Sequence, residues 1–224
     1  MKTEARDEAR ALRFNGLSVR EIERELGVSR SSVSRWVRGV VMPAEAAALL
    51  ARRSGAGRLA AAQRKADAAR DRRLAFQEEG RRRARVEPAE HVAGCMLYWA
   101  EGTKQRSSVE IANSEPELLR VFADFLRRFF AVPSGDIYLR CNLFADHASR
   151  QAEVERFWLD ALGLPPSSLR TSMVNVASSA SKGKRTNMLP YGTASLRVHS
   201  TRIVQTIYGS IQELGGFTRP AWLD

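Results

Sequence analysis

Residues 18–38 read Ser-Val-Arg-Glu-Ile-Glu-Arg-Glu-Leu-Gly-Val-Ser-Arg-Ser-Ser-Val-Ser-Arg-Trp-Val-Arg, and this stretch decides the fold of the N-terminal region. Ile22 and Leu26 lie four residues apart, which places both side chains on one face of a helix. A second apolar face follows with Val33 and Trp36, which lie three residues apart. The stretch therefore predicts two short amphipathic helices in succession.

The segment between the two apolar faces has the composition of a tight turn. Gly27 can adopt the left-handed conformation that ends a helix, and Ser29 can cap the N-terminus of the next one. Val28 can fill the space between the two helices. Upstream, the segment 3–15 can supply a third helix whose apolar residues complete a small core: Ala9, Leu12 and Phe14. We therefore expect a mainly α N-terminal domain.

This arrangement resembles the helix-turn-helix of resolvases, transposases and small repressors. The apolar residues stand where that motif needs them, and Gly27 is its turn glycine. Glu23 departs from the pattern, because the family usually has alanine there facing the second helix. We expect this acid to point toward solvent. The resemblance implies that the protein binds double-stranded DNA.

The second helix of the motif is expected to carry the DNA contacts. A helix fits the major groove, and its outward side chains near the N-terminus reach the base edges. Arginine can donate two hydrogen bonds to the O6 and N7 atoms of guanine, and serine is short enough to allow close approach. The candidate base contacts are Ser29, Arg30, Ser31, Ser34 and Arg35, and the candidate phosphate contacts are Arg20 and Arg38.

The charge distribution divides the chain into three parts. The net charge of +11 and the pI near 10.5 favour a polyanionic partner. Residues 44–86 have the largest excess, with 12 basic and five acidic residues. We therefore expect a helix-turn-helix domain over 1–43, a basic helical linker over 44–88 and a further domain over 89–224.

The composition of the linker favours a helix that is broken at Ser54–Gly57 and ended by Gly80 and Pro88. A coiled coil is an alternative, although the apolar spacing from Leu59 onward is filled mainly by alanine. The linker charge is interpreted either as a solvated helix surface or as phosphate contact. The arginines considered for phosphate contact are Arg70, Arg72, Arg73, Arg81, Arg82, Arg83 and Arg85.

The C-terminal region predicts an α+β domain in which helices cover one face of a sheet. Alternating or apolar runs predict strands at 108–112, 136–144, 168–176 and 191–199. Helical spacing predicts helices at 89–102, 118–130, 150–162 and 200–213. The other face of this sheet is predicted to be polar and open. It bears Arg140 and Arg197, which with the loop residues Lys182, Lys184 and Arg185 are further candidate DNA contacts.

The C-terminal region also resembles LAGLIDADG-type domains, which occur in homing endonucleases and in certain bacterial DNA-binding regulators. The resemblance rests on Leu97, Ala100, Glu101 and Gly102 at the end of an apolar helix, and it covers about 89–213. It implies that the motif helices of two copies pack side by side and that their terminal acids hold a divalent metal. Glu101 occurs once per chain, so cleavage would require a homodimer.

The sequence argues against membrane and secreted proteins. It has no run of 18 apolar residues, and its N-terminus is charged, so we expect a cytoplasmic, nucleoid-associated protein without a membrane partner. Two cysteines are too few for a disulfide scaffold.

The predicted function is sequence-specific DNA binding by a transcriptional regulator or phage-type repressor that needs no cofactor. One alternative is a Mg²⁺-dependent endonuclease that uses Glu101 as a metal-binding, catalytic residue. Another is an accessory protein of a recombinase.

Overall fold

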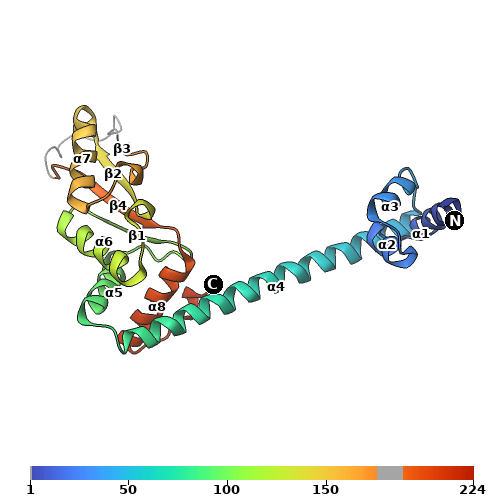
Figure 1. The fold of residues 1–224 in the computed structure, drawn as a ribbon, viewed down its shortest axis with the longest axis horizontal. Helices are drawn as coiled ribbons and strands as arrows, with labels where there is room; N and C mark the ends of the chain where they lie inside the picture. Colours follow the sequence, from blue (N-terminus) through green and yellow to red (C-terminus); the bar gives the residue numbers. More distant parts are fainter. Residues whose placement is uncertain (1, 176–188) are drawn as a thin grey trace. The chain divides into compact units, whose positions relative to one another are not determined.

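The computed structural model describes residues 2–175 and 189–224 (Figure 1). The chain forms two compact units, residues 1–68 and residues 69–224. The boundary between them falls within one helix, α4 (Ala44–Ala84), rather than at Pro43 or Glu87. Each unit has a hydrophobic core of its own.

The N-terminal unit is built from three short helices and the start of α4. They are α1 (Lys2–Phe14), α2 (Val19–Leu26) and α3 (Arg30–Trp36). The core contains four buried side chains: Ala9, Ile22, Val33 and Val37. Leu12, Leu26, Val28 and Trp36 pack around them, as the sequence predicts. The prediction for Phe14 is wrong: it is the last residue of α1, and its side chain is 52% exposed.

Local hydrogen bonds fix the ends of α2 and α3. Gly27 has φ +61°, the left-handed conformation expected of the turn glycine, and Ser29 Oγ accepts a hydrogen bond from the backbone of Ser32. Ser18 and Glu21 form a capping box at the start of α2, which the sequence analysis missed. The Ser-x-x-Glu spacing carries this signal. The turn geometry of the motif is therefore determined locally.

The predicted break in the basic segment is wrong, because α4 continues through Gly55, Gly57 and Gly80. A glycine costs a helix about 1 kcal/mol relative to alanine, which the Ala- and Arg-rich neighbours of Gly55 and Gly57 offset. Gly80 is buried, and its lack of a side chain allows α8 (Thr201–Gly215) to approach.

The C-terminal unit is an α+β structure, as predicted. Its remaining helices are α5 (Ala89–Glu101), α6 (Pro116–Phe130) and α7 (Gln151–Leu162). Its strands are β1 (Val109–Asn113), β2 (Tyr138–Phe144), β3 (Met173–Asn175) and β4 (Thr193–Val198). Short 3₁₀ turns lie at Ser134–Asp136, Ala145–Arg150, Pro166–Ser168 and Pro220–Trp222.

The four described strands form one sheet in the order β1-β4-β2-β3. β4 is antiparallel to both of its neighbours, whereas β3 pairs with β2 in parallel. In this register Arg197 of β4 lies between Glu110 of β1 and Tyr138 of β2. Side chains of alternate residues therefore form rows across the open face.

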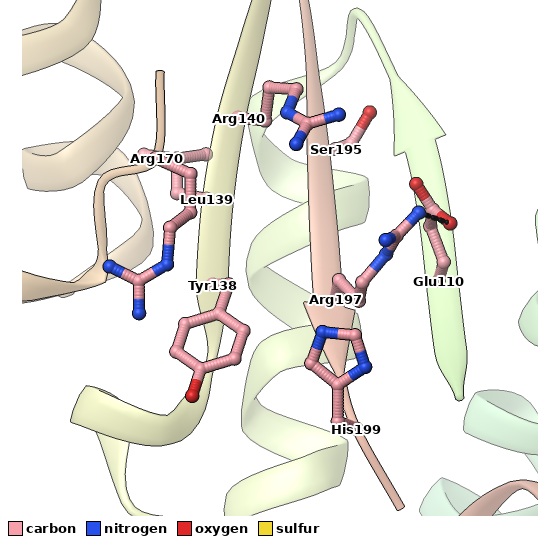
Figure 2. Close-up of a pocket in the computed structure, with 8 residues that line it drawn as sticks. All are labelled: Glu110, Tyr138, Leu139, Arg140, Arg170, Ser195, Arg197 and His199. Carbon is pink, nitrogen blue, oxygen red and sulfur yellow. Dashed lines mark hydrogen bonds and ion pairs between the residues drawn. The ribbon is translucent and has the colours of Figure 1, made fainter. Parts of the chain in front are cut away.

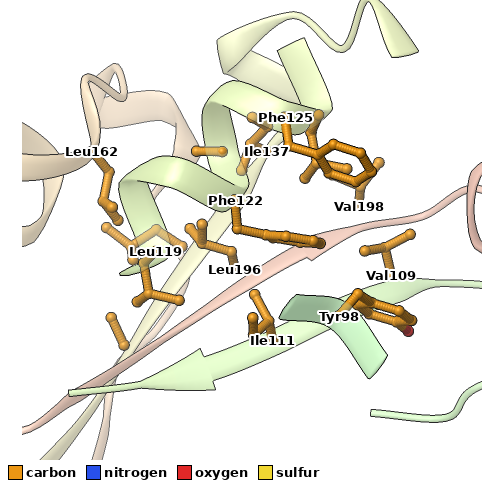
Figure 3. Close-up of a cluster of buried hydrophobic side chains, with 14 of the residues drawn as sticks. Tyr98, Val109, Ile111, Leu119, Phe122, Phe125, Ile137, Leu162, Leu196 and Val198 are labelled. Carbon is orange, nitrogen blue, oxygen red and sulfur yellow. The ribbon is translucent and has the colours of Figure 1, made fainter. Parts of the chain in front are cut away.

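The core of this unit lies between the sheet and its helices. Figure 3 shows Leu119, Phe122 and Phe125 of α6 on the side of the sheet that carries Leu196 and Val198. These side chains are at most 5% exposed. The two cysteines, Cys95 and Cys141, are free and buried, and burial raises the pKa of each thiol to about 12.

The last turns of α4 belong to this core because they contact α8 directly. A Cβ atom added to Gly80 would lie 2.0 Å from the carbonyl oxygen of Thr206, and one added to Gly209 would lie 1.9 Å from that of Gln77. Gln77 Nε2 donates to Gln205 Oε1 at 2.7 Å and accepts at its Oε1 from Gln212 Nε2 at 2.9 Å. The end of the expected linker is therefore a packed helix.

Candidate nucleic-acid interface

The exposed side of α3 presents the polar residues that the sequence singled out. Ser29, Arg30, Ser31, Ser34 and Arg35 are all exposed. Ser29 Oγ lies 3.1 Å from Ser31 Oγ and 3.0 Å from Ser32 Oγ, so the serines form one hydroxyl cluster at the helix N-terminus. Three clustered hydroxyl groups, the hydroxyl of Ser34 and two guanidinium groups, all able to form hydrogen bonds, thus lie on one short helix or at its cap.

Arg30 is held by an acid of the preceding helix. Its Nε atom lies 2.9 Å from Glu23 Oε2, and their side chains are 57% and 32% exposed. Glu23 therefore points across the turn toward α3 and does not simply extend into solvent as we expected. An Nε contact leaves both terminal nitrogens of the guanidinium for other acceptors.

The three other arginines of the motif that are candidate DNA contacts are exposed and unpaired. In the part of the chain that the structure describes, no hydrogen bond or ion pair holds Arg20, Arg35 or Arg38. Their guanidinium groups are hydrated in the free protein and are available to an acceptor such as a phosphate or a guanine edge.

Intramolecular partners hold most of the linker arginines that were considered for phosphate contact. Arg83 Nη2 donates to the Phe129 carbonyl oxygen at 2.7 Å, and Arg73 Nε donates to that of Leu223 at 2.6 Å. Arg70, Arg81 and Arg85 form ion pairs with acids of the same unit. Arg72 and Arg82 are exposed and make no such contact among the described residues. Five of the seven arginines considered for phosphate contact therefore have partners within the C-terminal unit.

The open face of the sheet carries a second basic cluster. A cavity of about 370 Å³ is lined by Glu110, Tyr138, Leu139, Arg140, Arg170, Ser195, Arg197 and His199. Figure 2 shows the side chains of Arg140, Arg170 and Arg197 around it. The sequence identified Arg140 and Arg197 but missed Arg170, which lies just after Leu169, a residue that bridges to Leu139 of β2. The strand predicted at 168–176 includes this position, but the sequence does not show which face of the sheet Arg170 joins.

The remaining candidates are three basic residues between β3 and β4 in the sequence and one acid at the end of α5. Lys182, Lys184 and Arg185 lie outside the described residues. Glu101 is the exposed last residue of α5, and Asn113 Nδ2 lies 3.4 Å from its Oε2. Lys104 donates to the carbonyl oxygens of Tyr98 and Gly102 rather than pairing with Glu101. Among the described residues, no three His, Cys, Asp or Glu side chains are grouped to hold a metal.

The comparisons with known proteins bear on the N-terminal unit. A helix-turn-helix family model matches residues 11–51. The matched range contains both helices of the motif and the turn at Gly27, so the N-terminal unit contains a helix-turn-helix domain. No curated protein and no solved structure matches the chain. The resemblance of residues 89–213 to LAGLIDADG domains therefore stays a hypothesis. Over the described residues, no helix is long and apolar enough to span a membrane.

Proposed function

We propose that the protein is a sequence-specific double-stranded DNA-binding protein that acts as a transcriptional regulator. In this proposal α3 enters the major groove, with Arg30 and Arg35 reading base edges beside the serine cluster. Arg20 and Arg38 contact the phosphate backbone. No cofactor takes part in this function.

One observation carries the proposal: a short helix at a helix-turn-helix position presents polar groups and keeps its apolar side inward. Val33 is fully buried, whereas Ser31, Ser34 and Arg35 are exposed on the same helix. Arg35 in the last turn of this helix has no hydrogen-bond or ion-pair partner among the described residues and is available to DNA. The match of the helix-turn-helix model supports the same assignment.

The proposal includes a homodimer, because two copies of a short recognition helix read more base pairs than one and bind with higher combined affinity. Regulators of this architecture bind half-sites about one helical turn apart. The C-terminal unit is the candidate for the dimer contact or for a second DNA surface. Repression rather than activation is the finer form of the proposal.

The experiment is selection of bound fragments from random double-stranded DNA by the full chain. We expect one enriched motif, and an inverted repeat within it would support the homodimer. A single unrepeated half-site would refute the dimer and leave base reading in place. No retention of DNA even at low ionic strength would overturn the proposed function.

The endonuclease alternative is tested on the same selected site. The wild-type chain and Glu101→Gln are incubated with that DNA and Mg²⁺. Unchanged DNA in both reactions agrees with a binding protein. Cleavage by the wild type alone would replace the proposal with the enzyme.

A further inference from the structure

The open face of the sheet in the C-terminal unit gathers more positive charge than its own acids neutralise. The cavity on this face is lined by three arginines and by one carboxylate, that of Glu110. Glu110 already accepts from Arg197 Nη2 and from Gln105 Nε2. Arg140 and Arg170 therefore have no carboxylate partner among the described residues.

Strand pairing explains why these side chains converge. Arg197 of β4 lies opposite Tyr138 of β2. Two residues further along the same pair of strands, Arg140 lies opposite Ser195. Diagonal neighbours on one sheet face are about 7–8 Å apart, within reach of long side chains. Arg170 reaches the cavity from the edge of β2 that does not face β4, because its backbone N–H donates to the Leu139 carbonyl oxygen at 2.8 Å.

Two of the three arginines, Arg170 and Arg197, are held in place before any ligand arrives, whereas Arg140 has no partner among the described residues. The guanidinium carbon of Arg170 lies 4.1 Å from the centroid of the Tyr138 ring, and its Nη1 donates to the Ser167 carbonyl oxygen at 3.1 Å. The His199 ring lies 5.7 Å from that of Tyr138 on the same face. Three guanidinium groups that line one cavity with a single carboxylate favour an anion that neutralises them.

We infer that this cavity, which we call the sheet cup, binds a phosphate group. Arg140 and Arg170 supply donors to its oxygens, and Arg197 is oriented by Glu110 at the rim. Planar guanidinium groups match the geometry of phosphate oxygens in paired hydrogen bonds. The phosphate group belongs either to a DNA backbone or to a small phosphorylated ligand, and both sources present the same chemistry to the cup.

The test uses inorganic pyrophosphate as the probe and the full chain in low salt, with binding measured by titration calorimetry. We expect saturable binding that falls by about tenfold in Arg140→Gln/Arg170→Gln, since two charge-assisted contacts are lost. The matched control is Arg106→Gln/Arg156→Gln, which removes two exposed arginines of the same unit whose side chains have no hydrogen-bond or ion-pair partner among the described residues. It should change the affinity by less than about twofold, because only the general field of the protein changes.

Arg140→Gln alone is the second variant, because Arg140 makes no contact among the described residues that the fold would lose. It should weaken pyrophosphate binding in a protein with unchanged thermal unfolding. Absence of saturable binding to the wild type, or equal losses in the cup and control variants, would overturn the sheet cup.

Measuring DNA affinity as a function of salt concentration distinguishes the two possible sources of the phosphate, a DNA backbone and a small ligand. If DNA supplies it, the slope of log affinity on log salt becomes shallower by nearly one unit per lost contact in the cup variant only. If a small ligand supplies it, the slope stays that of the wild type while pyrophosphate binding is still weakened. The pyrophosphate result stands even if the helix-turn-helix domain binds no specific site.

Discussion

Arginines on the exposed side of the helix-turn-helix motif and arginines near the end of α4 differ in what they contact. Arg35 and Arg38 of the helix-turn-helix extend into solvent without a partner among the described residues. In the C-terminal unit, Arg73 and Arg83 donate to backbone carbonyl oxygens of the same unit. The same residue type is therefore left free for an external partner in one place and stabilises the fold in the other. An excess of basic residues therefore indicates a nucleic-acid surface where guanidinium nitrogens remain without intramolecular acceptors, as in Arg35 and in the terminal nitrogens of Arg30.

The largest effect is expected where α4 meets α8. Gly80→Ala should destabilise the C-terminal unit by about 3 kcal/mol or more, because its Cβ would collide with the backbone of Thr206. Gly55→Ala, in open space on the same helix, should stabilise the protein by up to about 1 kcal/mol. Denaturant unfolding of the two variants measures the contrast. Similar effects at both glycines would mean that the end of α4 is not packed on α8.

The second prediction sharpens the roles of the unpaired arginines. Arg35→Ala should cost about 1–3 kcal/mol of affinity for the selected site and much less on unrelated DNA, because a base contact is lost. Arg38→Ala should weaken binding to both DNAs by similar factors, since it removes a phosphate contact. Fluorescence anisotropy on the two duplexes tests this. Equal losses of Arg35→Ala on both would reject base reading.

The third prediction concerns an arginine that serves the fold. Arg83 donates to Phe129, pairs with Glu87 and lies over the Phe130 ring, with a guanidinium carbon 4.8 Å from the ring centroid. Arg83→Gln should therefore cost about 1–2 kcal/mol of stability through the lost hydrogen bonds. It should leave the salt dependence of DNA binding unchanged. If the slope of log DNA affinity against log salt became shallower while stability stayed at the wild-type value, Arg83 would instead be a DNA contact.

The fourth prediction tests the capping box of the N-terminal unit. Ser18→Ala should destabilise this unit by about 1 kcal/mol, because the backbone N–H of Glu21 loses its acceptor. Thermal unfolding measures the loss. Ser54→Ala on α4 is the control, since it lies in an exposed helical position and should cause little change.

The same box predicts a pH dependence. The hydrogen bond from the Ser18 backbone is the main cause that lowers the pKa of Glu21 below its ordinary value of 4.5. A carboxyl with a lowered folded pKa stabilises the protein above its unfolded pKa and loses that contribution as pH falls through the folded pKa. Stability measured from pH 7 to pH 3 should therefore fall less in Glu21→Gln than in the wild type. Identical pH profiles would contradict the box.

The smallest effect is expected at the acid beside Arg30. Glu23→Gln should lower the preference for the selected site over unrelated DNA by about 0.5 kcal/mol, because Arg30 loses the charge-assisted bond that orients it. Glu25→Gln removes the same charge from an exposed residue of α2 and should leave the preference unchanged. Competition binding measures both. If both variants showed the same preference for the selected site over unrelated DNA, Glu23 would not orient Arg30 and would contribute only its negative charge.

The helix-turn-helix and the order of elements in the C-terminal unit could be predicted from the sequence. Ile22, Gly27, Ser29 and Val33 specify their structure through spacing and local backbone chemistry, which act within a few residues. The helices after residue 107 and the strands β1, β2 and β4 follow apolar periodicity in the same way. The strand predicted at 168–176 is shorter in the described part of the structure, because Pro166–Ser168 forms a 3₁₀ turn and β3 begins at Met173.

The intramolecular partners of the arginine side chains could not be predicted from the sequence. Arg30 pairs across the turn with Glu23, and the arginines near the end of α4 reach carbonyl groups far along the chain, such as that of Leu223. Arg170 joins the sheet cup only because β2 and the segment after α7 pair in parallel.

The sequence by itself determined which residues form helices and strands and which of them face a core, because these choices depend on near neighbours and on hydrophobic spacing. Only the tertiary structure decided which arginines remain unpaired. Pairing depends on acceptors brought close by the fold from distant parts of the chain, and both partners must lie within a few ångströms.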